Sequence, residues 1–177
     1  FWAVARGPYF SESQHANFRK MIRDVFGKRA QKLGFRSSAN EDDPTRELRA
    51  QLLMLVADHG GDEKLLAEAT KLAKAWLVDR KAVDPDMIQT VLQMAASHGD
   101  MKLFDAFVAE AKKATERIDR NRLLRALGGF RDPAIAQKAF ALPLDPDFDA
   151  REASAALWSA TGFAETRELA YEKKKKN

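Results

Sequence analysis

Cysteine is absent from this chain of 177 residues. Its absence excludes disulfide bonds, thiolate zinc sites and cysteine nucleophiles, so the fold has to be stabilised by packing. It leaves the localisation unknown, because proteins on either side of a membrane can do without disulfides. No stretch approaches the roughly 18 apolar residues of a membrane span, and residues 1–6 lack the basic start and apolar run of a secretory signal. We therefore expect no membrane span.

Histidine is scarce, and no catalytic motif surrounds the three copies that are present. The zinc-peptidase signature His-Glu-x-x-His needs two imidazoles one helical turn apart. His15, His59 and His98 are far apart in sequence, and none of them precedes a glutamate. Glycine-rich phosphate loops and the Gly-x-Ser-x-Gly elbow are missing as well. The sequence thus indicates no catalytic residue and no metal ligand, and we expect this chain by itself not to be an enzyme.

A large excess of one charge is also missing. The formal net charge is +4, and the terminal run at residues 173–176 alone contributes four lysines. The rest of the chain is near neutral, whereas nucleic-acid-binding proteins concentrate positive charge on one face. A charge run at a chain end is typical of a solvated helix terminus. Nucleic acid is therefore not the expected partner.

Apolar residues at helical spacing run through nearly the whole chain, and each stripe would cover one side of a helix. The stripes lie within residues 18–26, 48–56, 65–76, 88–95 and 103–108. Ser11 with Gln14 forms the capping box of a first long helix, whereas Gly7-Pro8 forbids a regular helix at the start. The sequence predicts an irregular segment over residues 1–10, then about eight helices and no sheet over residues 11–177.

Proline and glycine mark where these helices should begin and end. An aspartate before a proline places a side-chain N-cap ahead of a residue suited to the first helical turn. Such pairs occur at Asp43-Pro44, Asp84-Pro85 and Asp132-Pro133. Glycine often terminates a helix in the left-handed conformation. We expect that role at Gly60, Gly99 and Gly128.

A repeated segment indicates how the helices are arranged. Residues 55–66 match residues 94–104 with one glycine inserted, and looser copies surround Gly129 and Gly162. Each copy would be a helix, a tight turn and a returning helix. The corresponding glycines are 39, 30 and 33 residues apart, which is close to the periods of helical-pair solenoids. We therefore predict an all-α fold, a HEAT-like α-α superhelix of antiparallel helix pairs.

Three arginines are the candidate substrate-binding residues. A helix in a concave stack can point several guanidinium groups inward, where they bind a carboxylate; surface salt bridging is the alternative. The candidates are Arg120, Arg122 and Arg125. The core side of their helix should be formed by Leu123, Leu124 and Leu127. We therefore expect Arg122 or Arg125 to be partly exposed.

Other distinctive residues have structural explanations. The acidic run 41–43 could bind a cation, but its place before Pro44 and a basic helix favours capping. His59 and His98 each precede a glycine at a predicted helix end, where the helix dipole favours an imidazolium. Trp76 and Trp158 fall within helical stripes, which favours core packing over a base-stacking surface.

Six short strings in this order are similar to one known family. They are Leu33-Gly34-Phe35, Glu41-Asp42, Leu48-Arg49, residues 82–86 (Ala-Val-Asp-Pro-Asp), residues 122–128 (Arg-Leu-Leu-Arg-Ala-Leu-Gly) and residues 131–135 (Arg-Asp-Pro-Ala-Ile). Over roughly residues 20–177 the chain resembles the helical C-terminal domain of aminopeptidase N-like zinc aminopeptidases. In that family the domain is a HEAT-like superhelix that folds over a thermolysin-like catalytic domain and encloses the peptide-binding chamber.

The resemblance implies a function and a set of partners. The chain would be a segment of a longer protein that continues past both ends, with the zinc motif and the Gly-x-Met-Glu-Asn motif encoded upstream of Phe1. It would be a non-catalytic domain that caps the active-site chamber and restricts or positions peptide substrates. Its partners would be its own upstream catalytic domain, which holds the zinc, and the peptide. The alternative is a free-standing HEAT-like scaffold or a nucleic-acid-binding helical-repeat protein.

Overall fold

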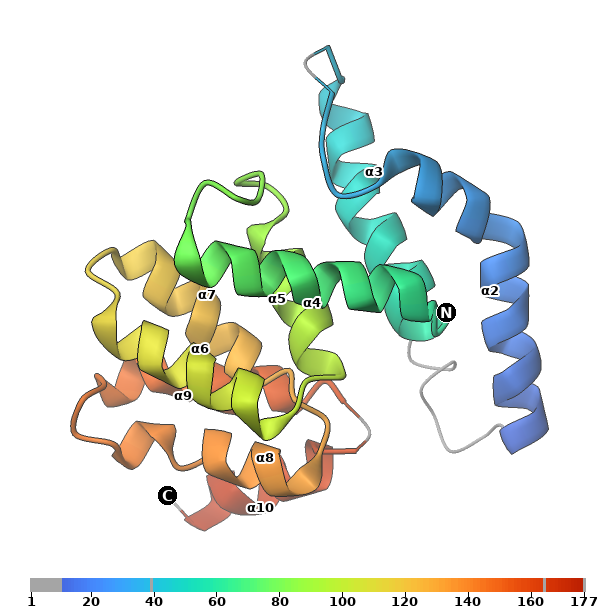
Figure 1. Cartoon of the computed structure of the whole chain (residues 1–177). Coiled ribbons are helices and arrows are strands. Elements are labelled where there is room, and N and C mark those ends of the chain that lie inside the picture. Colours follow the sequence, from blue (N-terminus) through green and yellow to red (C-terminus); the bar gives the residue numbers. More distant parts are fainter. Residues whose placement is uncertain (1–10, 39, 164, 177) are drawn as a thin grey trace. The chain divides into compact units, whose positions relative to one another are not determined.

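The structure is a computed structural model that describes residues 11–38, 40–163 and 165–176, with side chains as far as residue 172. The irregular segment predicted for residues 1–10 lies outside these residues. Within them the chain forms nine α-helices, one π-helical segment and one short 3-10 helix, and no strand (Figure 1). The all-α prediction is confirmed. None of the described helices is long and apolar enough to cross a bilayer.

The chain divides into two compact units, Phe1–Met94 and Ala95–Asn177, and the boundary falls within the helix Ile88–Ser97. The elements are α2 (Glu12–Leu33), α3 (Asp43–Met54), the π-helix η1 (Leu55–His59), α4 (Glu63–Val78), α5 (Ile88–Ser97), α6 (Met101–Lys113), α7 (Arg117–Leu127), α8 (Pro133–Ala139), the 3-10 helix η2 (Leu142–Leu144), α9 (Ala150–Ala160) and α10 (Arg167–Lys176). Each unit is described by itself below. The predicted HEAT-like superhelix stays a prediction.

The first unit is built on a helical hairpin. Figure 1 shows α3 running back along α2 after the loop that joins them, and α2 packs against both α3 and η1. The stripe at positions 52–56 supplies the buried Leu53 and Val56, and α4 adds the fully buried Trp76. Arg80 covers the Trp76 ring at 4.2 Å from its centre. The core position predicted for Trp76 is therefore confirmed.

The second unit packs α6 against α7 and α7 against α9, and α9 in turn contacts η2, α8 and α10. Three phenylalanines form its centre. The Phe130 ring meets the rings of Phe104 and Phe107 edge to face, with centroids 5.4 and 6.0 Å apart. Trp158 does not join this core: the stripe of α9 buries Ala156 and Leu157, so the neighbouring indole faces outward and is 62% exposed. The prediction of a buried Trp158 was wrong.

The predicted helix starts are partly confirmed. Ser11 forms the expected capping box with Gln14, and Asp132 caps α8 by accepting the backbone N–H groups of two later residues. The cap of α3 is Asp42, one residue earlier than predicted. The prediction at Asp84-Pro85 was wrong, because α5 begins only at Ile88. The Asp84 carboxylate instead accepts hydrogen bonds from the backbone N and Oγ of Ser37, at 2.8 and 2.7 Å.

The glycines at helix ends are needed for a different reason from the predicted one. The glycines with positive φ among the described residues are Gly34 and Gly61, so the left-handed role expected of Gly60, Gly99 and Gly128 was wrong. Close packing excludes a side chain instead. A Cβ at Gly128 would lie 2.0 Å from the Ala156 carbonyl oxygen, and one at Gly99 would lie 2.6 Å from the Phe130 ring.

Candidate functional site

Helix α7 carries the predicted binding arginines in the second unit. The helix buries Leu123, Leu124 and Leu127 completely, as expected from the sequence. Since these leucines occupy the core side, the arginines leave the helix toward its other sides. The structure places the three candidates in three different environments.

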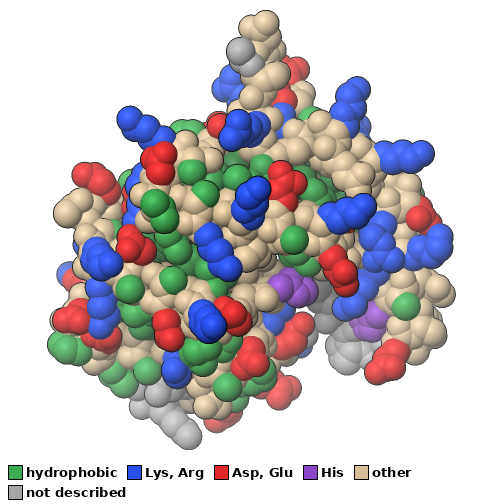
Figure 2. Space-filling model, in the orientation of Figure 1, with side chains coloured by type: hydrophobic (Ala, Val, Ile, Leu, Met, Phe, Trp, Pro, Cys, Tyr) green, Lys and Arg blue, Asp and Glu red, His purple; other side chains and the backbone are tan. Residues whose placement is uncertain are grey.

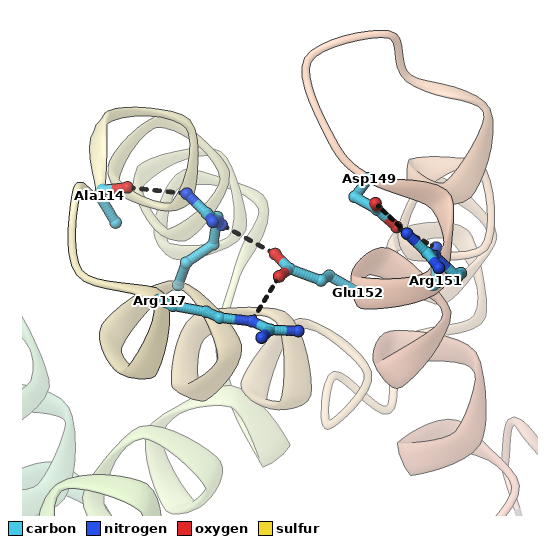
Figure 3. Close-up of polar contacts among 6 residues, drawn as sticks. Ala114, Arg117, Asp149, Arg151 and Glu152 are labelled. Carbon is cyan, nitrogen blue, oxygen red and sulfur yellow. Dashed lines mark hydrogen bonds and ion pairs between the residues drawn. The ribbon is translucent and has the colours of Figure 1, made fainter.

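Arg120 is occupied by contacts within the unit. Its Nε donates to Glu152 Oε2 at 3.0 Å, and one terminal nitrogen donates to the Ala114 carbonyl, also at 3.0 Å. Arg117 donates from Nε to the other oxygen of Glu152 at 2.8 Å, so one carboxylate of α9 is held between two guanidinium groups of α7 (Figure 3). The hydrogen bond from Arg120, followed by that from Arg117, lowers the pKa of Glu152. Arg120 therefore forms a surface salt bridge, which was the alternative to binding a substrate carboxylate.

Arg122 is engaged within its own helix. Its terminal nitrogen donates to Asp119 Oδ1 at 3.0 Å, one turn earlier. The side chains of both residues are about one-fifth exposed, at 21% and 17%. A substrate carboxylate at this position would have to compete with Asp119 for the guanidinium.

Arg125 is the exposed member of the set and makes no ion pair with any residue that the structure describes. This confirms the expectation that one of the two later arginines is exposed. Arg125 shares a side of α7 with Arg122 and Ile118, because these positions follow each other at i+4 and i+3 steps. Ile118 is 59% exposed. An exposed guanidinium without an ion pair is available to bind a carboxylate.

Three of the strings that carried the family resemblance, at residues 33–35, 41–42 and 48–49, meet at one buried arginine, Arg49. Arg49 donates from one terminal nitrogen to the carbonyl oxygens of Leu33 and Gly34, and from the other to the Glu41 carboxylate. The side chains of Arg49 and Glu41 are only 3% and 7% exposed. Gly34 has a φ of 55°, which side-chain-bearing residues rarely adopt. These residues therefore join the end of α2 to α3 and have a structural role.

The two acids that follow Glu41 are structural as well. The Asp42 carboxylate accepts the Thr45 N–H at 3.0 Å, and hydrogen bonding by Thr45 lowers the pKa of Asp42. Asp43 pairs with Arg46 at 3.4 Å on the surface. The predicted structural role of the run 41–43 is confirmed by these contacts. Within the described residues no group of three or more acidic or histidine side chains is placed to hold a metal ion.

His59 and His98 lie at helix ends, as predicted. His59 is the last residue of η1, and His98 directly follows α5. His59 Nε2 lies 3.8 Å from the carboxylate of its neighbour Asp58, whose side chain is 3% exposed. His59 is followed by two glycines and His98 by one, and in both copies the next residue is an aspartate that caps the following helix, Asp62 for α4 and Asp100 for α6. The two best copies of the sequence repeat therefore share their local structure.

Charge on the visible surface is mixed. Figure 2 shows basic and acidic side chains interspersed, with basic ones more numerous over α2. The sequence of α2 holds six Lys or Arg and two Asp or Glu. Even there a cation is paired, since Lys20 contacts Asp24 at 2.5 Å. This pattern is typical of solvated helix faces.

A pocket of about 260 Å³ in the first unit was not anticipated from the sequence. Its lining includes three charged and three apolar side chains: Arg36, Glu68, Asp84, Phe35, Leu72 and Val83. The pKa of Asp84 is lowered, mainly by the two hydrogen bonds from Ser37 and to a smaller extent by nearby Arg36. These residues come from three separate segments, so neither spacing nor composition could bring them together before the loops were folded.

Comparison with known proteins identifies the family of this chain. A profile of the family described as the ERAP1-like C-terminal domain matches residues 4–177. The chain belongs to this family, and the match begins earlier than the resemblance noted from residue 20. The chain is also 25% identical over 125 residues to Aminopeptidase 2 of Candida albicans. That alignment covers 71% of this chain and 14% of the relative, so the chain spans a small part of the relative's length.

Proposed function

We propose that this chain is the non-catalytic C-terminal helical domain of a zinc-dependent aminopeptidase, in which it caps the active-site chamber and restricts or positions peptide substrates. The observation that carries the proposal is the family match over residues 4–177. The similarity to a protein named as an aminopeptidase supports the class of the parent. The family match also favours this function over a free-standing scaffold or a nucleic-acid-binding repeat protein.

In this proposal the two tasks of the parent are divided. The upstream part of the parent would hold the zinc ion and remove the N-terminal residue of a peptide. The helix pairs described above would form a HEAT-like bowl that closes over that part and limits which peptides enter. The helical domain would thus supply selection, while bond cleavage occurs upstream. Its partners would be the upstream catalytic domain and the peptide itself.

Arg125 is the residue that we propose to receive the carboxylate at the far end of a peptide. Its guanidinium is exposed and unpaired within the described chain, whereas Arg120 and Arg122 already contact Glu152 and Asp119. Arg120 would support the site by holding α7 to α9 through Glu152, whereas the pair between Arg122 and Asp119 lies within α7. Both arginines would bind substrate only after exchanging these carboxylates for the peptide.

The variant Arg125→Ala, made in the full-length parent, should selectively lower kcat/KM for long peptide substrates. We expect kcat/KM to fall about tenfold for such peptides, the equivalent of one charge-assisted hydrogen bond. Single-residue aminoacyl reporters should keep their kcat/KM, because they are too short to reach α7. Steady-state kinetics with both substrate types measures the difference.

The matched control is Arg29→Ala, which removes an exposed, unpaired arginine from α2 in the other unit. Arg29→Ala should leave kcat/KM unchanged for both peptides and single-residue reporters. Equal losses on peptides and reporters in Arg125→Ala would indicate damaged folding or domain docking. Unchanged kinetics on both would show that Arg125 is surface charge with no part in binding.

A further inference from the structure

The pocket of the first unit contains two charged side chains of opposite sign that make no hydrogen bond or ion pair with the described residues. They are Glu68 and Arg36. Glu68 and Leu72 are four residues apart on α4 and therefore project from the same side of that helix. Arg36 lies in the loop after α2, directly after the buried Phe35. The pocket thus offers one carboxylate and one guanidinium beside apolar side chains.

The third charged residue of the pocket, Asp84, has a structural task. Its carboxylate accepts both the N–H and the hydroxyl of Ser37, which fixes the loop after α2 to the loop before α5. Arg36 lies close enough to favour the ionised form of Asp84 but does not hydrogen-bond to it. Asp84 therefore holds the wall of the pocket, and Glu68 and Arg36 are the groups available to a ligand.

The size of the pocket restricts that ligand. Its volume of about 260 Å³ lies just below the range of about 300–1,000 Å³ that is usual for drug-sized ligands. A single amino acid is of suitable size. The apolar lining is firm, because Phe35 and Val83 are only 4% and 6% exposed and belong to the core. An aliphatic side chain can be buried against such a lining.

We propose that this pocket binds a free aliphatic α-amino acid. The ammonium group of the ligand would face Glu68, its carboxylate would face Arg36, and its side chain would lie against Phe35, Leu72 and Val83. A zwitterion supplies opposite charges on the two sides of one carbon atom, and an aliphatic side chain supplies the apolar surface. This site lies outside α7 and does not depend on the aminopeptidase function proposed above. A protein segment with a basic, an apolar and an acidic side chain carries similar groups, and the experiment separates the two sources.

The test is a titration of the 177-residue chain with L-leucine, followed by ¹⁵N–¹H NMR. We expect shifts confined to residues 33–36, 68–72 and 82–84, with a Kd on the order of 1 mM, as is reasonable for so small a ligand. N-acetyl-L-leucinamide has the same side chain but neither charge and should cause no shifts at equal concentration. The capped tripeptide Ac-Lys-Leu-Glu-NH₂ should bind more weakly than L-leucine.

Variants of the two charged residues make the test specific. Glu68→Gln and Arg36→Gln should each weaken L-leucine binding about tenfold, since each removes one charge-assisted contact. The controls Glu165→Gln and Arg167→Gln change exposed residues of the other unit and should leave binding unchanged. The proposal is overturned if L-leucine causes no shifts, or if N-acetyl-L-leucinamide binds equally well. Tighter binding of the tripeptide than of L-leucine would overturn the free amino acid as the occupant.

Discussion

Gly128→Ala should destabilise the second unit by at least about 3 kcal/mol, the upper part of the range for overpacked positions. The added Cβ would lie 2.0 Å from the carbonyl oxygen and 2.7 Å from the carbonyl carbon of Ala156. Both atoms belong to the backbone of α9, so no side-chain rotation can relieve the overlap. The end of α7 would have to separate from α9, which is one of the main contacts of the unit. Urea denaturation with amide hydrogen exchange of α9 measures the loss.

Gly27→Ala is the matched comparison, because it makes the same chemical change inside a helix. Gly27 lies in the interior of α2, and a Cβ placed there meets no atom within 4 Å. Alanine should therefore stabilise the first unit by about 0.5–1 kcal/mol, through the lower flexibility of the unfolded chain. Opposite signs for the two variants are expected. Destabilisation of similar size in both would contradict the close contact between α7 and α9.

Arg49→Met should cost about 3–5 kcal/mol, the usual effect of removing one partner of a buried ion pair. The change leaves the Glu41 carboxylate buried without its cation and leaves the Leu33 and Gly34 carbonyl oxygens without a donor. The double variant Arg49→Met with Glu41→Met should be more stable than Arg49→Met alone, since it removes the buried unpaired charge. Chemical denaturation followed by tryptophan fluorescence, in a background that carries Trp2→Phe and Trp158→Phe, reports on this unit because Trp76 is in its core.

The control for that change is Arg46→Met, one turn earlier on α3. Arg46 pairs with Asp43, but the two side chains are 41% and 94% exposed. Solvent weakens such a pair, so the loss should be below about 1 kcal/mol. If Arg49→Met costs no more than Arg46→Met, the cluster around Arg49 does not hold α2 to α3. The resemblance strings at residues 33–49 would then need another explanation.

The elements of the fold could be predicted because local sequence determines them. Periodic apolar residues gave the helices, and Ser11 and Asp132 gave two of their starts through bonds to backbone groups two or three residues away. The start of α5 could not be predicted, since the Asp84 side chain bonds to Ser37, 47 residues earlier. The helix-end glycines were found for the wrong reason. Their neighbours, such as Ala156 beside Gly128, become visible only after the helices pack.

The candidate site shows the same division between local and tertiary information. The buried leucines of α7 and the exposure of Arg125 follow from helical spacing. The engagement of Arg120 does not, because its partner Glu152 lies 32 residues later on another helix. Arg117 was missed for the same reason, although its three-residue spacing from Arg120 places both on one side of α7. The ion-pair partners of a surface arginine are determined by how the helices pack and not by its neighbours in sequence.

The proposal that this domain is non-catalytic is tested most directly by assaying the 177-residue chain alone against aminoacyl reporter substrates, with and without added zinc. The full-length parent serves as the positive control under identical conditions. We predict turnover by the parent and none above background by the chain, because the proposal places the zinc ion and the catalytic groups in the upstream part of the parent. Zinc-dependent hydrolysis that stays with the chain through stringent purification would contradict the proposal.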